Sequence, residues 1–243
     1  MAGAGPAYTD RIGSTGAAYL VELEGEHLLL DLGQGSFPRV ASEMDPADLA
    51  AVLVSHLHPD HFIDLVPLRH YLLFECQPPR RVVVRGPADL ERRIDDLHGE
   101  PGFAAAALDV RPLTGGPNDV VGRRIDARLV THTKESYAFR IDAGDQPGLV
   151  YSGDCGRATD LVPLIRPGDT LLCEVSFGEG PVPDGAQHLD APAVASLAAT
   201  TRPGRVLLTH LQMGFDPDRT VAAVVAGWDG DVRFVWPGDR LTI

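Results

Sequence analysis

Residues 55–61 read SHLHPDH, which places three histidines and an aspartate within seven positions. The segment completes the apolar run LAAVLVSH (49–56), a pattern typical of a buried strand. Polar side chains are costly to bury unless they are paired or bind an ion. A group of four ligand-type residues directly after a strand therefore predicts a metal site, and its members are His56, His58, Asp60 and His61.

Three further apolar strands end in a residue that can bind a metal. RLVTH ends at His132, LVYSGD at Asp154 and RVLLTH at His210. A lone histidine is more often a core or surface residue, but side chains at the ends of neighbouring strands can converge on one point. We therefore expect His132 to join the first two histidines of the 55–61 segment, and His210 to join its aspartate and last histidine. Asp154 is expected to bridge the two ions.

The donors in this set are imidazole and carboxylate groups, which suit Zn²⁺ at bond lengths of about 2.0–2.2 Å. Manganese and iron accept the same donors and stay open as alternatives. We therefore expect two divalent metal ions, with zinc as the first choice.

The remaining composition limits the partners and the compartment. The 243 residues carry a formal net charge of −13, and an acidic surface repels phosphate backbones. A small-molecule substrate is therefore favoured over a large nucleic acid, although metal ions can reverse the field locally. Cys76, Cys155 and Cys173 are scattered and predict no disulfide framework. No apolar stretch predicts a membrane helix or a signal peptide, so we expect a cytoplasmic protein.

The rest of the chain alternates strand-like and helix-like segments, with residues 99–120 predicted as a connection containing at most a short helix. The predicted strands are a hairpin over 17–33 and the segments 49–56, 80–86, 124–132, 136–142, 148–154, 171–177 and 205–210. The predicted helices are 62–75, 87–99, 157–165, 190–201 and 217–227. This mixture indicates sheets covered by helices. We expect one domain over 1–243 with two similar halves, about 1–120 and 121–243.

The motifs HLHPDH, YSGD and LLTH, in this order, resemble those of the metallo-β-lactamase superfamily. The segment HLLLDLG, with Asp31, resembles the strand and turn before its signature. The resemblance implies a four-layer αββα sandwich of two similar halves, with a binuclear site along one edge. Within the superfamily, SYAFRI after His132 is similar to the ribonuclease Z and small phosphodiesterase branch. So is CEVSF, with Glu174, followed by QHLDA, with His188.

Two departures from that branch are visible. The opening segment MAGAGPAYTDRIGSTG is poor strand material, so the first edge strand of the fold is expected to be missing or degenerate. Only two strands and a turn fit between His132 and Asp154. They leave no room for the long arm that transfer-RNA-processing relatives carry there.

The resemblance implies a binuclear hydrolase that uses a metal-bridging hydroxide, most naturally a phosphodiesterase for a cyclic nucleotide or a short oligonucleotide. Asp60 is expected to orient the nucleophile, His188 to act as the general acid and Glu174 to orient His188. Asp31 is expected behind a ligating histidine. Glu174 as a structural acid and His188 as an exposed loop residue stay open. So do hydrolysis of a carboxylic ester, lactone or thioester, a non-catalytic metal-binding accessory role, and a homodimer.

Overall fold

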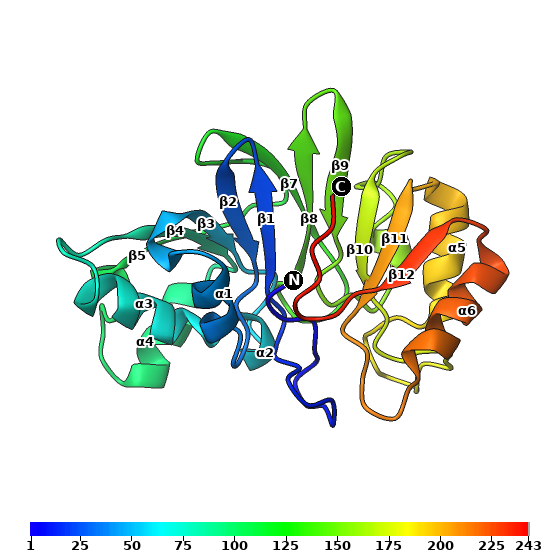
Figure 1. Ribbon diagram of the computed structural model, residues 1–243, viewed down its shortest axis with the longest axis horizontal. Helices are drawn as coiled ribbons and strands as arrows, with labels where there is room; N and C mark the ends of the chain where they lie inside the picture. Colours follow the sequence, from blue (N-terminus) through cyan, green and yellow to red (C-terminus); the bar gives the residue numbers. More distant parts are fainter. Residues whose placement is uncertain (243) are drawn as a thin grey trace.

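The computed structural model describes residues 1–242 and contains two β-sheets that pack against each other across a shared apolar core (Figure 1). The first sheet has five strands in sequential order, with β1 and β2 antiparallel and the others parallel. These strands are β1 (Tyr19–Leu23), β2 (Glu26–Leu30), β3 (Leu49–Leu53), β4 (Val82–Gly86) and β5 (Leu108–Pro112).

The second sheet has seven strands in the order β12, β11, β10, β9, β8, β7, β6. The strands from β9 to β12 are parallel, and those from β6 to β9 are antiparallel. They are β6 (Gly116–Val120), β7 (Arg123–Leu129), β8 (Tyr137–Ala143), β9 (Gln146–Tyr151), β10 (Thr170–Glu174), β11 (Arg205–Thr209) and β12 (Asp231–Phe234). The chain thus passes from one sheet to the other between Pro112 and Gly116.

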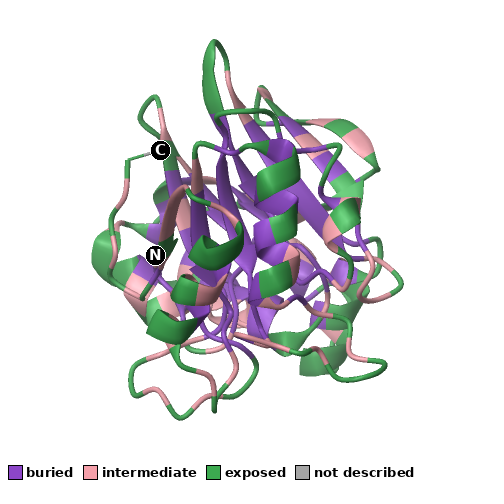
Figure 2. Cartoon of the chain, turned by 90° about the vertical axis from the view of Figure 1, so that its right-hand side faces the viewer, coloured by how far each residue is buried: buried purple, intermediate pink, exposed green. Residues whose placement is uncertain are grey.

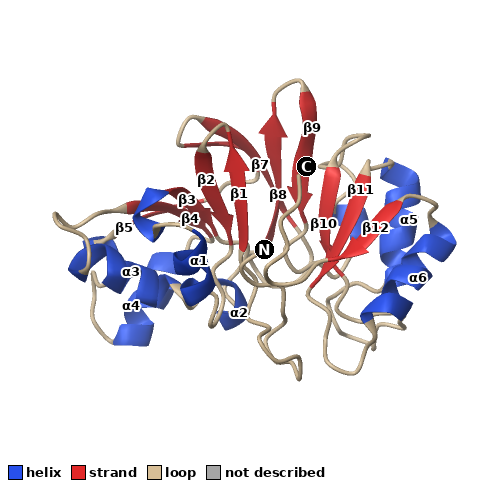
Figure 3. Cartoon of the chain, viewed as in Figure 1, coloured by secondary structure: helices blue, strands red, loops and turns tan. Residues whose placement is uncertain are grey.

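Helices cover the outer face of each sheet, as Figure 3 shows in blue. The first sheet is covered by α1 (Phe37–Glu43), α2 (Pro59–Phe62), α3 (Leu65–Phe74) and α4 (Leu90–His98). The second sheet is covered by α5 (Ala191–Thr201) and α6 (Pro217–Gly227). One apolar core lies between the sheets and one lies under each helix layer. Figure 2 shows the buried positions concentrated on the strands and on the helix faces turned toward them. The predicted four-layer αββα sandwich is confirmed.

Local sequence signals explain where the second helix layer begins. The Asp190 side chain accepts a hydrogen bond from Ala193 N–H at 3.0 Å, and that of Asp216 accepts one from Arg219 N–H at 2.9 Å. Such aspartates satisfy the free amides of a first helical turn. In α6 the cap is followed directly by Pro217, whose missing N–H costs nothing at that position. These helices match the predicted segments 190–201 and 217–227.

The prediction for residues 99–120 was wrong, because this segment contains the edge strands β5 and β6. The sequence of β6 is GPNDV, which has poor strand propensity. It pairs with β7 on one side only, and an edge strand tolerates proline and polar residues because half of its backbone groups face solvent.

Four other elements differ from the prediction. The helix expected over 157–165 is a single 3₁₀ turn, Ala158–Asp160, and the turn that follows contains Pro163. The helix expected over 62–75 begins at Leu65 as α3, with Pro67 in its first turn as predicted, and Phe62 instead ends the separate short helix α2. Both α1 and β12 were not predicted.

The chain before β1 forms no named strand. It makes one isolated bridge between Gly3 and Ala18, in line with the expected missing or degenerate edge strand. Among residues 1–242, no helix combines the length and the apolar character needed to cross a membrane.

Candidate metal centre

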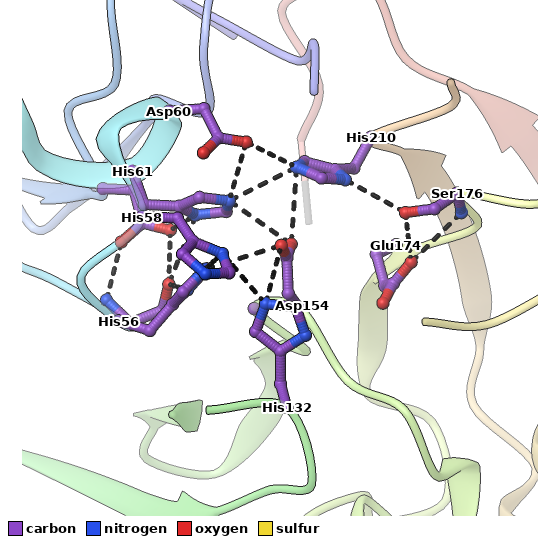
Figure 4. Close-up of polar contacts among 12 residues, drawn as sticks. His56, His58, Asp60, His61, His132, Asp154, Glu174, Ser176 and His210 are labelled. Atoms are coloured by element: carbon purple, nitrogen blue, oxygen red, sulfur yellow. Dashed lines mark hydrogen bonds and ion pairs between the residues drawn. The ribbon is translucent and has the colours of Figure 1, made fainter. Parts of the chain in front are cut away.

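The loops that follow four strands place seven polar side chains together at one edge of the sandwich (Figure 4). The strands β3, β7 and β9 each end three residues before the first of these side chains in their loop, and β11 ends one residue before His210. The structure therefore brings together all seven predicted metal ligands: His56, His58, Asp60, His61, His132, Asp154 and His210.

The first group consists of His56, His58, His132 and Asp154. The Nδ1 atom of His58 lies 3.0 Å from Nε2 of His56 and 3.1 Å from Nε2 of His132. The Oδ2 atom of Asp154 lies 3.5 Å from each of those Nε2 atoms. His56 and Asp154 are buried, whereas His58 is exposed, so this group opens toward solvent.

The second group consists of Asp60, His61, Asp154 and His210, all buried. The Nε2 atoms of His61 and His210 are 3.3 Å apart. Asp154 contributes Oδ1, which lies 3.3 Å from Nε2 of His61 and 3.4 Å from Nε2 of His210. Asp60 Oδ2 lies 3.3 Å from Nε2 of His210 and 3.6 Å from Nε2 of His61. The two groups therefore share Asp154 through different oxygens.

These separations fit divalent cations. Zinc–nitrogen bonds of about 2.0–2.1 Å in a tetrahedron place neighbouring donors about 3.3–3.4 Å apart. Asp154 Oδ1 is buried and has no hydrogen-bond partner among the described residues. A buried acceptor without a partner is costly unless a cation or another donor binds it. His132 Nδ1 donates to the carbonyl of Gln187 at 2.8 Å, so its Nε2 points a lone pair into the centre.

The electrostatics keep several of the donors in metal-binding form. His61 is the exception, because Asp154 and Asp31 outweigh burial and raise its pKa well above the usual value. Burial lowers the pKa of His56 and that of His132, so both imidazoles are neutral at pH 7. Burial alone would raise the pKa of Asp154. The imidazoles of His210, His61 and His56 outweigh it and hold the pKa of Asp154 well below its usual value. The carboxylate is therefore ionised.

Asp31 lies directly behind the second group. Its Oδ2 accepts hydrogen bonds from His61 Nδ1 at 2.7 Å, from Tyr151 Oη at 2.6 Å and from Ser55 Oγ at 2.8 Å. The bond to Nδ1 fixes the ring of His61 with Nε2 directed into the centre. This is the position that the sequence predicted for Asp31.

Glu174 and His188 form a pair beside the centre. Glu174 Oε1 accepts a hydrogen bond from His188 Nδ1 at 3.0 Å, and the His188 ring lies 4.7 Å from that of His132 between centroids. Burial lowers the pKa of His188, but the hydrogen bond and charge of Glu174 outweigh it and raise the pKa to about 9. His188 is half-buried and borders the open side of the first group.

A sequence family described as a beta-lactamase superfamily domain matches residues 29–211. The chain belongs to this superfamily.

Curated relatives agree with this membership. Uncharacterized protein ML1173 of Mycobacterium leprae is 32% identical over 222 residues, which cover 89% of this chain and 78% of the relative. The probable metallo-hydrolase YhfI of Bacillus subtilis is 25% identical, covering 91% of this chain and 92% of YhfI. A ribonuclease Z of Methanosarcina mazei is 21% identical, with 83% of each protein covered. The chain is therefore a metallo-hydrolase of the β-lactamase superfamily with clusters suited to metal binding.

Solved structures show the same fold. The YhfI crystal structure superposes with a TM-score of 0.86 at 22% identity and covers 98% of this chain and 95% of YhfI. A diphosphatase from the PhnP family superposes with a TM-score of 0.77 at 16% identity and covers 100% of this chain and 96% of the diphosphatase.

The sequence analysis missed three polar residues that surround the candidate metal centre. Ser55 and Tyr151 donate hydrogen bonds to Asp31. Ser176 connects two histidines to Glu174, and Figure 4 shows its contacts with Glu174 and His210. The Ser176 hydroxyl donates to Glu174 Oε2 at 2.6 Å and lies 3.1 Å from Nδ1 of both His188 and His210. Each missed residue lies within three positions of a recognised motif residue, and that proximity was the available signal.

Cys155 follows Asp154 directly, but its side chain does not face the metal centre. It is buried in the core under α5 and α6, together with Cys173. Its thiol donates to the carbonyl of Arg157 at 3.2 Å. The thiol is thus part of the core packing and is absent from both ligand groups.

Proposed function

We propose that this chain is a two-metal phosphodiesterase that acts on small substrates such as a cyclic nucleotide or a short oligonucleotide. The single observation that carries the proposal is the pair of four-residue groups that share Asp154 through its two oxygens. Two cations held by one carboxylate stand close enough to act on the same phosphoryl group, which is how two-metal hydrolases work.

The first ion would be held by His56, His58, His132 and Asp154. The second would be held by Asp60, His61, Asp154 and His210. Zinc is the first choice, with manganese and iron as alternatives. Bound divalent ions lower the pKa of water and offset the negative charge that develops on the substrate.

The side chains beside the ions have separate roles. Asp60 would bind the second ion through Oδ2. Its Oδ1 would then be free to accept a hydrogen bond from the attacking water and orient it. His188 would be the general acid for the leaving oxygen. Glu174 occupies Nδ1 of His188, so Nε2 is the nitrogen that is free to carry a proton to the substrate. Glu174 would thereby orient the ring and favour its protonated form.

Two observations favour a small phosphodiester. The names ribonuclease Z and diphosphatase, carried by proteins similar to this chain, describe hydrolysis at phosphorus. The hairpin between β8 and β9 turns within a few residues, so no arm for a large RNA extends from it, and the net charge of −13 repels a long polyanion.

The proposal is tested by measuring the metal content of the purified protein and its turnover of bis(p-nitrophenyl) phosphate and p-nitrophenyl acetate. We expect two ions per chain and faster hydrolysis of the phosphodiester. A screen of cyclic nucleotides and dinucleotides would then identify the substrate. His210→Ala, which removes one ligand, is the inactive control. Hydrolysis of the carboxylic ester alone would contradict the assignment to phosphorus. Absence of any turnover with both ions bound would indicate an accessory protein.

A further inference from the structure

The chain before β1 folds into a loop that reaches the metal centre. Residues 5–15, here called the N-terminal loop, are closed at their base by a hydrogen bond from Gly5 N–H to the carbonyl of Thr15 at 2.8 Å. Figure 1 draws this loop in blue below the two sheets. The residue just before it, Ala4, accepts a hydrogen bond from His210 N–H at 3.1 Å. The loop therefore lies against the segment that supplies a ligand of the second group.

One side chain of the N-terminal loop binds that segment. The Arg11 guanidinium donates from Nη1 to the carbonyl of Leu211 at 2.8 Å. From Nη2 it donates to the carbonyl of Phe215 at 2.8 Å and to that of Gln212 at 3.2 Å. A planar fork of donors is suited to several carbonyls at once, whereas a single ammonium is not. Arg11 thus fixes the backbone that directly follows His210.

His210 needs such support because of its backbone conformation. Its φ is 61°, in the left-handed region that residues with a Cβ rarely adopt. Conformations of this kind persist only where the surrounding structure determines them. The segment is held from the other side by Gln212 N–H, which donates to the carbonyl of Ser176 at 3.2 Å. Arg11 supplies three further fixed points, the carbonyls that it binds in the same loop.

We propose that Arg11 is a positioning residue for the second ion. It holds the segment after β11 so that Nε2 of His210 faces Asp60 and Asp154, and it acts through backbone carbonyls without touching a donor atom of the centre. The inference rests on the proposed function, because it requires that the second group binds a cation.

The test compares metal retention in the wild-type protein, Arg11→Ala, Arg11→Lys and Arg39→Ala. Each metal-loaded protein is titrated with a chelator, and the ions released are counted by a chromophoric indicator. In Arg11→Ala we expect one of the two ions to bind about 10–100-fold more weakly, as for other residues that orient metal ligands. The other ion should be unaffected. Arg11→Lys should fall between wild type and Arg11→Ala.

Arg39→Ala is the matched control. Arg39 Nη2 donates to the carbonyl of Gly13 at 3.1 Å, so it binds the N-terminal loop from the opposite side and carries the same charge. Among residues 1–242, Arg39 makes no hydrogen bond or ion pair with the segment after His210, so this variant should retain both ions as the wild type does. Circular dichroism of the metal-free variants checks that each is folded. If Arg11→Ala does not fold, metal retention is compared between wild type and Arg11→Lys instead.

Equal retention of both ions by wild type and both Arg11 variants would overturn the inference. So would an equal loss in Arg39→Ala, because the effect would then belong to the loop as a whole. A wild-type protein that binds no cation would instead refute the proposed function, and this result is recognised before any variant is compared.

Discussion

At the scale of single residues, two polar side chains of the centre depend on strained backbone. Asp31 directly follows β2 with a φ of 59°, and His210 directly follows β11 with a φ of 61°. Left-handed backbone costs about 1–3 kcal/mol for a residue with a Cβ. Asp31 N–H is fixed by the carbonyl of Leu53 at 2.8 Å, and His210 N–H by that of Ala4. The fold accepts strain where a strand must turn its next side chain into the centre.

His188→Ala tests the general acid. We expect turnover of a phosphodiester with a poor leaving group to fall by about 10²–10⁴, with the metal content unchanged, because only proton transfer to the leaving oxygen is lost. His98→Ala, which removes an exposed imidazole at the end of α4, is the control. Loss of an ion from His188→Ala would identify His188 as a ligand, and unchanged turnover would exclude it from the reaction.

Asp154→Asn tests the shared carboxylate. The substitution preserves the shape of the side chain but removes the charge that both groups use, so we expect at least one ion to be lost on metal analysis. Asp184→Asn removes an exposed carboxylate in the loop before His188 and should leave the metal content unchanged. Two tightly bound ions in Asp154→Asn would contradict the bridge.

Residue identity and spacing were enough to predict which seven side chains meet. Four of them are consecutive or nearly so, and the others follow apolar strands, so the sequence itself carries the signal. The supporting residues were harder to predict. Ser55, Tyr151 and Ser176 look like ordinary strand or loop residues, and Arg11 resembles any surface arginine. Their roles depend on which segments the fold places next to each other, and local sequence does not contain that information.

At the scale of elements, β8 is joined to the loop before β10 by a buried ion pair. Arg140 donates to both carboxylate oxygens of Asp169, from Nε at 2.8 Å and from Nη2 at 3.0 Å. Asp169 also accepts from Gly148 N–H at 2.7 Å and Arg166 N–H at 2.9 Å. The carboxylate thus connects three successive segments of the second sheet.

Asp169→Asn should destabilise the protein by about 3 kcal/mol, because the buried Arg140 would keep only the partly exposed Asp142, at 3.4 Å, as a compensating charge. Urea unfolding of the metal-free protein measures this loss. Asp109→Asn, which breaks an exposed pair with Arg111, should have a far smaller effect. Comparable losses in both variants would show that the buried pair has no special role.

The same pair predicts a dependence of stability on pH. Burial would raise the pKa of Asp169, but the hydrogen bonds from Arg140, Arg166 and Gly148 outweigh it and hold the pKa below its usual value. The carboxylate therefore stabilises the fold above the unfolded pKa of about 3.9, and this contribution is lost as the pH falls through the folded pKa. The stability difference between wild type and Asp169→Asn should shrink below about pH 4. A difference that stays constant would contradict this linkage.

Elements with a strong hydrophobic period were predicted well, whereas edge elements were not. The strands β3 and β11 are apolar runs in the interior of a sheet, and their sequence patterns indicate buried strands. The edge strand β6 follows no such pattern, because its pairing with β7 determines its conformation. The 3₁₀ turn at Ala158–Asp160 precedes the apolar run LVPLI (161–165), but Asp160 Oδ2 accepts hydrogen bonds from the backbone and hydroxyl of Thr131. These tertiary contacts override helix propensity.

At the scale of the whole molecule, both sheets supply ligands to each group. His56 and His58 follow β3 of the first sheet, whereas His132 and Asp154 follow β7 and β9 of the second. The core between the sheets is continuous, with Tyr19 and Leu53 on one side and Phe139 and Leu207 on the other. We propose that the chain is one domain of two halves, because neither sheet contains a complete site.

Removal of the ions should therefore weaken the whole fold. An ion present at about 1,000 times its Kd stabilises the native state by about 4 kcal/mol, which for a protein of this size corresponds to a rise in Tm of the order of 10 °C. We expect a chelator to lower the Tm by that amount and to abolish hydrolysis, and added Zn²⁺ to restore both. An unchanged Tm would mean that the native state binds no ion.

The buried position of Cys155 and Cys173 has a practical consequence. Burial raises the pKa of Cys155 to about 12, and that of Cys173 well above its usual value, so neither forms the thiolate that alkylating and oxidising reagents attack. Cys76 is only partly covered. A maleimide dye should therefore label only Cys76 on the folded protein. It should react with Cys155 and Cys173 only when the layer formed by α5 and α6 opens, so the rate of their labelling measures the opening of this core.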